Sequence, residues 1–405
     1  MEKYYQIRDP IHGYISLNQM EYDIINTLSF QRLRYIRQLG LTDLVYPGAT
    51  HNRFSHSLGV MHLAERVLRQ VFSKAENLNF SQNKKEQIIK IMRLAGLLHD
   101  LGHPPFSHAL ENYFENNLTH EEMTKKIIEE TEIGEIIIQK GKMEEISLLD
   151  VLNLLTSTPS KELSFLKALL SSELDIDKMD YLMRDSLYCG VRYGIFDLER
   201  LLNTVTLIPF EDNSFLGIEE NGLHALEAFV LARYYMFAQV YFNPTSKALE
   251  LHLGNFFADK NISWPSDVQK FISLDDNWVF YILKENKEHP DAKAVLTHKH
   301  YPLIYETQEH LEENKEKEFL NLINLFYEQK PNLKIFVSVA TKDPHHFSKS
   351  NIYLKDIYGN ILKVEKKSSL LSHLKRINQY RIYTLNIYEK EVKDWFEKKC
   401  KKLFS

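Results

Sequence analysis

Three histidines and an aspartate lie close together around a Gly-Pro-Pro break in the sequence. The segment runs from His99-Asp100 through His103 to His108. Burying a lone charged carboxylate is costly, and a metal ion removes that cost because imidazole and carboxylate both ligate first-row divalent ions. A single His-Asp pair would be explained as well by a histidine ending a helix and an aspartate capping the next turn. The density of this cluster favours a metal site.

A zinc protease is a second interpretation of the same segment. His99 and His103 are four residues apart, as in the H-E-x-x-H motif. That motif needs an unbroken helix and a glutamate after the first histidine, whereas this chain has Asp100 there and Gly102 follows soon after. The sequence therefore argues against a protease.

Two more polar segments could bring side chains to the same ion. One contains His51, Arg53 and His56, and the other contains Asp177, Tyr181 and Asp185. On a helix the last three residues share one face because they are four residues apart. From that segment alone, a solvated face carrying an Asp–Arg pair is the simpler explanation.

Helices must position these segments, because a helical period dominates most of the chain. Apolar residues recur every three or four positions over 53–72, and residues 85–101 are apolar on most sides, as in a buried helix that Gly102 ends. Further helices are predicted over 108–117, 119–131, 147–155, 160–171, 174–187 and 222–254. Alternation around a turn at 9–13 predicts an N-terminal β-hairpin of strands 5–8 and 14–17.

The period changes to two beyond residue 333. It predicts strands over 333–339, 351–354, 360–364 and 380–387, followed by a lysine-rich helix over 390–404. We therefore expect a mainly α protein with a large helical domain over 1–325, and mixed helices and loops over 257–330 would close this domain. A small α/β region over 326–405 would follow.

The overall composition excludes several classes of protein. The chain has 405 residues, of which 44% are hydrophobic and 26% charged, and its net charge of −5 does not favour nucleic acid or a membrane as partner. Two cysteines cannot form a disulfide framework, and no stretch reaches the roughly 18 apolar residues of a membrane span. We expect a cytoplasmic globular protein.

Taken together, the polar segments match a known pattern of His, His-Asp and Asp on separate helices. With the strings Asp9–Gly13, Phe30–Gly40 and Pro47–Val60, the chain resembles the HD superfamily of metal-dependent phosphohydrolases, and most closely its deoxynucleoside triphosphate triphosphohydrolases, over about residues 4–250. The resemblance implies an HD-type helical domain that converts dNTPs to deoxynucleoside and inorganic triphosphate. The alternatives are an HD phosphohydrolase acting on a nucleoside monophosphate, cyclic or modified nucleotide, and a non-catalytic nucleotide sensor.

The resemblance also assigns the metal and the catalytic residues. It implies that His56, His99, Asp100 and Asp177 hold the metal, and this ligand set favours Mn, Fe, Co, Ni or Zn over Mg. Mg²⁺ would instead accompany the triphosphate. His120 matches the histidine that protonates the departing 5′ oxygen, and Glu111 stands where the family has an orienting aspartate.

The remaining matches concern the substrate. The phosphate-binding positions are Arg53, Lys178 and Arg233, with His103 and His108 lining the same site; the sugar-binding positions are Gln38, Leu39, Tyr181, Asp185 and Tyr241, the last lying eight residues after Arg233 on the same expected helix. Because none of these contacts reads the base, several dNTPs should be accepted.

Regulation is where the chain departs from its relatives. Gln31 and Arg34 match part of an activator site, but Asn26 replaces an aspartate that reads guanine, and an amide cannot accept both guanine hydrogens. Phe237, Gln239, Asn243 and Pro244 replace a histidine and basic residues. We expect activation by guanine nucleotides to be weakened, changed or absent. A homo-oligomer, dimer or tetramer, is still expected, and nucleic acid is not an expected partner.

Overall fold

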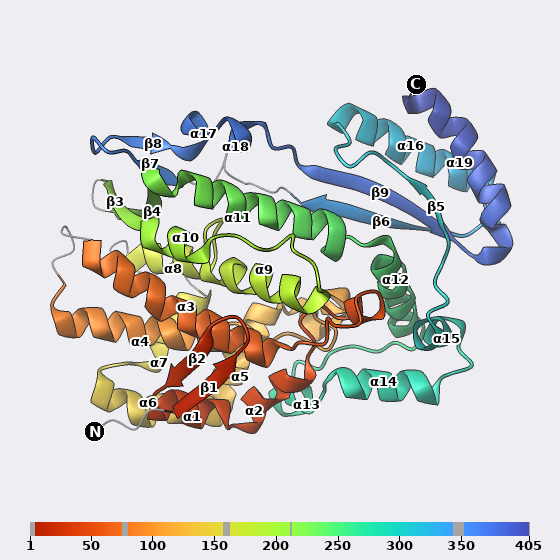
Figure 1. Ribbon diagram of the computed structural model, residues 1–405. Coiled ribbons are helices and arrows are strands. Elements are labelled where there is room, and N and C mark those ends of the chain that lie inside the picture. The colour runs from red at the N-terminus through yellow and green to blue at the C-terminus, as the bar shows by residue number, and fades with distance from the viewer. Residues whose placement is uncertain (1–4, 75–79, 157–162, 211–212, 343–351, 405) are drawn as a thin grey trace. The chain divides into compact units, whose positions relative to one another are not determined.

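The computed structural model describes residues 5–74, 80–156, 163–210, 213–342 and 352–404 (Figure 1). It forms two compact units, each made of three segments. The first contains Met1–Met236, Ile262–Tyr281 and His345–His373, and the second contains Phe237–Asn261, Ile282–Pro344 and Leu374–Ser405. The mainly α fold is confirmed, whereas the single domain boundary expected at residue 325 stays a prediction.

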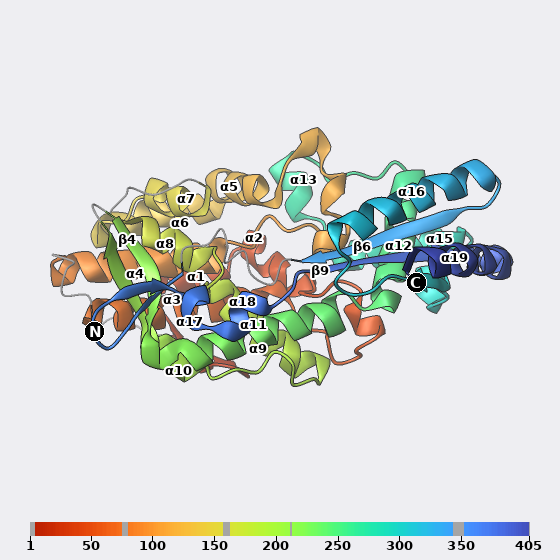
Figure 2. The ribbon, with the colours of Figure 1, turned by 90° about the horizontal axis from the view of Figure 1, so that it is seen from above.

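The first unit is built around two long helices, α3 and α4, which pack along each other. Its helices are α1 (Gln19–Ile25), α2 (Leu28–Gln31), α3 (Arg53–Lys74), α4 (Gln82–Leu98), α5 (His120–Glu130), α6 (Glu132–Gly141), α7 (Leu148–Thr156), α8 (Ser164–Leu170), α9 (Ile176–Cys189), α10 (Leu198–Thr204), α11 (Leu223–Met236), α13 (Val268–Ile272), α17 (Val364–Lys367) and α18 (Ser369–His373). Figure 2 shows α5, α6 and α7 along one side of the α3–α4 pair and α9, α10 and α11 along the other. The pair is therefore covered on both sides, which explains why both helices are buried on most of their faces.

Two sheets belong to the first unit. Strands β1 (Tyr5–Asp9) and β2 (Gly13–Leu17) form the expected antiparallel hairpin. The other sheet has the order β3-β4-β7-β8 and consists of β3 (Val205–Phe210), β4 (Asn213–Glu219), β7 (Tyr353–Lys355) and β8 (Ile361–Lys363), with β4 and β7 parallel. The hairpin of β3 and β4 was not expected from the sequence.

The second unit is a small sheet with helices on both faces. Its elements are α12 (Pro244–Asp259), α15 (Pro290–Thr297), β5 (Leu303–Glu306), α16 (Glu313–Gln329), β6 (Ile335–Lys342), β9 (Ile377–Thr384) and α19 (Glu389–Phe404), with strand order β5-β9-β6. Alternate residues of a strand face opposite sides, so Ile382 packs with α16 and α19 while Tyr383 packs with α12. Helix α14 (Asp276–Glu285) begins in the first unit and ends in the second.

Two expected helices differ from the structure, and one observed helix was not expected. The helix expected over 108–117 is a series of short 3-10 turns, because Ser107 and Asn116 have left-handed backbone angles, with φ of 51° and 57°. The helix expected over 222–254 is broken by a π turn at Phe237–Tyr241, after which Pro244 starts α12. Helix α6 was missed. The expected starts at residues 160 and 351 lie outside the described residues.

Candidate metal centre and active site

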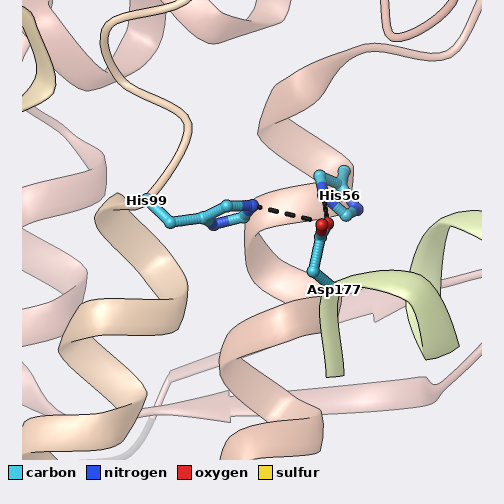
Figure 3. A group of neighbouring side chains, drawn as sticks. All are labelled: His56, His99 and Asp177. Atoms are coloured by element: carbon cyan, nitrogen blue, oxygen red, sulfur yellow. Dashed lines mark ion pairs between the residues drawn. The ribbon is translucent and has the colours of Figure 1, made fainter. Parts of the chain in front are cut away.

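The end of α4 and the helices α3 and α9 bring three predicted metal ligands together. Asp177 Oδ1 lies 2.9 Å from His56 Nε2 and 3.6 Å from His99 Nε2 (Figure 3). One ligand atom from each of the three residues lies within 4.8 Å of the other two. Side chains that are distant in the sequence thus converge as the resemblance implied, and the group could hold a metal ion.

The fourth predicted ligand, Asp100, lies beside this group. Its Oδ1 is 3.2 Å from His99 Nε2, and its Oδ2 is 3.7 Å from His56 Nε2. The same Oδ2 forms an ion pair with Arg53. Asp100 therefore divides its carboxylate between the histidines and a cation that belongs to the predicted phosphate site.

The two histidines are oriented so that their Nε2 atoms face the centre of the group. Nδ1 of His99 contacts the carbonyl oxygen of Gly96 at 2.8 Å, and Nδ1 of His56 contacts Asp180 at 2.8 Å. A proton fixed on Nδ1 leaves the Nε2 lone pair for a metal, which is the usual arrangement of metal-binding histidines. Nε2 of His99 is buried and makes no hydrogen bond. The donor set and this orphaned atom fit a divalent cation.

Asp180 is the centre of a buried network beneath His56. Besides His56, it contacts His12 Nε2 at 2.7 Å and accepts two hydrogen bonds from Arg184. Arg184 also donates to Asp9 in the N-terminal hairpin. A Cβ atom at Gly59 in α3 would collide with Asp180 and Arg184. The glycine therefore allows α9 to approach α3 closely enough for this contact.

The electrostatics of the group favour a positive charge at its centre. Burial alone would lower the pKa of His56, but hydrogen bonds with Asp177 and Asp180 raise it to about 10. Burial alone would raise the pKa of Asp177, but contacts with His56 and His99 hold this pKa below its usual range. Two ionised carboxylates thus face the imidazoles, and a metal cation would take the place of the histidine protons.

Glu111 and His120 form the predicted catalytic pair. Nδ1 of His120 contacts one oxygen of Glu111, and Nδ1 of His108 contacts the other at 2.9 Å. Hydrogen bonds with these two histidines hold the pKa of Glu111 well below its usual range, so its carboxylate is ionised. The ring of His103 stacks on His120 with a centroid separation of 4.1 Å, and burial and Arg53 lower the pKa of His103. His103 is therefore neutral.

Each of the three predicted phosphate-binding cations has an acidic neighbour. Arg53 pairs with Asp100 and donates to Ser107 Oγ at 2.9 Å. Lys178 lies 2.7 Å from Asp175, and Arg233 pairs with Glu173. Burial lowers the pKa of Lys178, but Asp175 outweighs it and raises the pKa. All three side chains carry a charge that an anionic ligand could share with these carboxylates.

The predicted sugar-binding residues fall in two groups. Asp185 contacts His51 Nε2 at 2.8 Å, and burial raises the pKa of Tyr181 on the same helix. Gln38 Oε1 is buried and makes no hydrogen bond, and Leu39 follows it. Tyr241 lies in the π turn and in the second unit. The expectation that it keeps α-helical register with Arg233 was therefore wrong, because a π turn changes the angular spacing.

The residues of the predicted activator site contact each other. Arg34 Nε donates to Gln31 Oε1 at 2.8 Å, and the Arg34 guanidinium lies over the ring of Phe54 at 3.6 Å. Asn26 ends α1 and donates to the carbonyl oxygen of Tyr22. These contacts place the first two residues together and leave their role a prediction.

Several residues that shape the site were missed by the sequence analysis. They are Asp9, His12, Glu173, Asp175, Asp180, Arg184 and Ser107. Asp180 and Arg184 carried a signal, since a carboxylate and a guanidinium four residues apart share a helix face beside Asp177. The partners on other segments carried none, because only the tertiary fold brings them together.

Comparisons with known proteins agree with this geometry. A sequence model of the HD domain matches residues 53–185. The uncharacterized Bacillus subtilis protein YwfO is 30% identical over 93% of this chain and 91% of its own length. The bovine deoxynucleoside triphosphate triphosphohydrolase SAMHD1 is 29% identical over 80% of this chain and 63% of its own length.

Solved structures with the same fold cover almost the whole chain. A hypothetical protein from Aquifex aeolicus has a TM-score of 0.82 and 32% identity over 97% of this chain and 100% of that one. A phosphohydrolase from Bacteroides thetaiotaomicron has a TM-score of 0.74 and 26% identity over 95% and 100%. Among the described residues, no helix has the length and apolar character needed to span a bilayer. The HD match includes His56, His99 and Asp177, and the chain belongs to the HD-domain family and shares its fold with a solved phosphohydrolase.

Proposed function

We propose that the protein hydrolyses deoxynucleoside triphosphates to deoxynucleoside and inorganic triphosphate. The observation that carries this proposal is the convergence of His56, His99 and Asp177 beside three buried or partly buried cations. A metal site alone would serve any HD phosphohydrolase. Three cations in addition suit a substrate with about four negative charges, as a triphosphate has.

The metal would be held by His56, His99, Asp100 and Asp177, and its imidazole ligands favour Mn, Fe, Co, Ni or Zn. When bound, such an ion supplies Lewis acidity toward a phosphate oxygen and lowers the pKa of a coordinated water. Of the three converging ligands, Asp177 has the most exposed side chain, 30% against 1% for His56. A substrate would therefore approach from the Asp177 side. Mg²⁺ would accompany the triphosphate.

Arg53, Lys178 and Arg233 would bind the phosphates by exchanging their carboxylate partners for phosphate oxygens. Arg53 is the most informative of them, because it already pairs with Asp100. A phosphate that takes over the Arg53 contact would free an oxygen of Asp100 for the metal. Binding of the phosphate and completion of the metal site would then support each other.

His120 would donate the proton to the departing 5′ oxygen. Glu111 holds His120 through Nδ1, so the proton to be transferred sits on Nε2. The ionised Glu111 carboxylate fixes the direction and the tautomer of the imidazole, so that Nε2 presents the proton that a general acid transfers. His103 is neutral and stacked against His120, which fixes the plane of the ring. Gln38, Leu39, Tyr181 and Asp185 would contact the deoxyribose.

The test is to identify the product. The metal-loaded protein is incubated with each dNTP in ¹⁸O-labelled water, and the products are separated by ion chromatography. We expect inorganic triphosphate that carries the label, because water attacks the α-phosphorus and the 5′ oxygen leaves with the deoxynucleoside. Release of only orthophosphate or pyrophosphate would contradict the proposal.

The alternative is an HD phosphohydrolase for a nucleoside monophosphate, a cyclic nucleotide or a modified nucleotide. It would use the same metal ligands but would not need Arg53, Lys178 and Arg233 together. Comparing turnover of dAMP and dATP at equal concentration separates the two, since the triphosphatase should act only on dATP.

The partners and location form a further part of the proposal. We expect a cytoplasmic homo-oligomer, a dimer or tetramer, with dNTP as substrate and without a membrane or nucleic acid partner. A nucleotide activator would involve Gln31 and Arg34, and light scattering with and without GTP or a second dNTP would measure its effect on assembly.

A further inference from the structure

The connection between α13 and α14 reaches the active-site loop although it lies outside the segment that matches the HD domain. Asp276, at the start of α14, is buried. Its Oδ1 accepts a hydrogen bond from the backbone amide of Phe106, and its Oδ2 accepts one from the backbone amide of Arg37, both at 2.9 Å. A single carboxylate thus binds two segments that are about seventy residues apart in the sequence.

Arg32 braces the other end of the same loop. Its guanidinium donates to the carbonyl oxygens of Leu101 at 3.3 Å and His103 at 3.0 Å. Its Nε donates to the carbonyl oxygen of Leu274 at 2.7 Å, just before Asp276. The loop that carries His103 and His108 is therefore held at two points, by Arg32 at His103 and by Asp276 at Phe106.

The backbone of this loop needs such support. Phe106 and Ser107 have φ angles of 57° and 51°, a left-handed conformation that is strained for residues other than glycine. Such residues persist where neighbouring groups fix them. Asp276 accepts the amide hydrogen of Phe106 itself, so it holds the first of the two strained residues in place.

The second segment bound by Asp276 leads into the proposed sugar site. Arg37 directly precedes Gln38 and Leu39, and a Cβ atom at Gly40 would lie 3.3 Å from the carbonyl oxygen of Phe106. The sugar-contacting segment and the catalytic loop therefore touch, with Asp276 hydrogen-bonded to both. Loss of its carboxylate would release the two together.

We propose that Asp276 is a positioning residue that fixes the spacing between segment 37–39 and the loop from His103 to His108, and thereby contributes to the rejection of ribonucleotides. The specificity part rests on the proposed dNTP hydrolysis. Within the described part of the chain, the hydrogen bonds given for Asp276 go to the backbone amides of Arg37 and Phe106, and none goes to a metal ligand. Its effect passes through the backbone positions of Gln38, Leu39 and the catalytic loop.

Burial raises the pKa of Asp276 to about 6, while the amides of Arg37 and Phe106 and the charges of Arg37 and Arg32 oppose the rise. The Arg37 side chain is itself paired with Asp43 at 2.8 Å, and Asp275 is the other carboxylate beside Arg32. The ionised carboxylate that accepts both amide hydrogens thus lowers the free energy of unfolding near neutral pH. That cost is expected of a group that serves the geometry of a site.

The test compares Asp276→Asn with Asp275→Asn. Both remove one negative charge, but Asp275 caps α14 by accepting the amide hydrogen of Trp278 at 3.0 Å, which asparagine also does. At position 276 the amide nitrogen of asparagine would face a backbone N–H, and because both groups are donors, one of the two hydrogen bonds is lost. We expect D276N to lower kcat/KM for dNTPs by about 10- to 100-fold, to bind the same amount of metal, and to lose most of the preference for dNTP over rNTP. D275N should keep wild-type values.

Two results would overturn the proposal. One is a D276N protein whose dNTP-to-rNTP ratio equals that of D275N. The other comes from the wild-type protein and needs no variant to fold. Amide hydrogen exchange should show that the amides of Arg37 and Phe106 are protected. Rapid exchange at both would show that Asp276 does not hold these amides. If the wild type releases no triphosphate from any dNTP, the proposed function fails, whereas the exchange measurement still decides whether Asp276 holds the two segments.

Discussion

The two halves of the candidate active site differ in how far they are shielded from water. The metal half is built from helices, and His56 and Asp180 have side chains that are 1% and 0% exposed. The catalytic half is built from short turns and the first residue of α5, and the side chains of His120 and His108 are 20% and 73% exposed. Both halves use the same chemical unit, an imidazole whose Nδ1 contacts a carboxylate.

The difference follows from what each half must do. A metal ligand needs a fixed direction and a fixed protonation state, and a buried network that includes Arg184 and His12 supplies both. A proton donor must be recharged from solvent after each turnover, so it needs access to water. Under the proposed function, one pairing of residues would therefore serve as a rigid support in one half and as an acid in the other.

The largest effect should come from breaking the metal half at its most exposed ligand. We expect Asp177→Asn to remove bound metal and to reduce dNTP turnover to the level of a reaction without enzyme. The fold should survive, because the side chain of Asp177 is 30% exposed. Elemental analysis and circular dichroism check the two statements. A variant that keeps full metal content would contradict the ligand assignment.

The catalytic half should respond in turnover and leave metal content unchanged. His120→Ala is expected to lower kcat by about 10²- to 10⁴-fold, the usual contribution of a general acid. His224→Ala is a matched control, because His224 forms the same histidine–glutamate contact with Glu227 at 2.8 Å but lies on the surface. Equal activity of the two variants would show that His120 is not the acid.

The free energy of unfolding should depend strongly on the buried network of the metal half and little on an exposed ion pair. Asp180→Ala leaves His12 and the Nδ1 of His56 buried without this carboxylate and leaves Arg184 paired with Asp9 alone, and loss of one partner of a buried ion pair costs about 3–5 kcal/mol. Glu199→Ala removes an exposed partner of Arg66 and should cost at most about 1 kcal/mol. Urea unfolding measures both. Similar losses for the two variants would mean that the network under His56 is not a special support.

The parts of the fold that were predicted correctly depend on local patterns. Helices α3 and α4 and the first hairpin follow from hydrophobic periodicity within each segment. Helix α6 was missed because Gly134 and a run of three isoleucines disfavour a helix locally, and packing of Ile133 and Ile137 overrides this preference. The left-handed angles at Phe106 and Ser107 could not be predicted, because contacts with distant residues impose them.

The same distinction applies to the site. His56, His99 and Asp177 could be named because each lies in a string that resembles a known family, although only the fold places them within reach of one another. Asp180 lay within such a string without an assigned role. Asp276 lies in a segment with no matching string, and its two hydrogen bonds exist only because α14 starts beside the loop. Sequence strings therefore reveal the reactive residues more readily than they reveal the residues that position them.

The smallest expected effect is a pH dependence of the free energy of unfolding that is caused by Asp276, the buried residue that supports the catalytic half. The pKa of Asp276 is about 6 in the folded protein and near 3.8 when it is exposed. The folded state therefore holds a proton that the unfolded state has lost between these values, so the contribution of Asp276 to the unfolding free energy falls by about 3 kcal/mol as the pH rises from about 4 to above 6. Asp276→Asn has no such proton. Relative to wild type, its unfolding free energy should rise over this range, and D275N should show no comparable trend. Urea unfolding at a series of pH values measures the difference in unfolding free energy between each variant and the wild type. A difference for D276N that stays constant with pH would mean that Asp276 does not titrate as a buried carboxyl group in the folded protein.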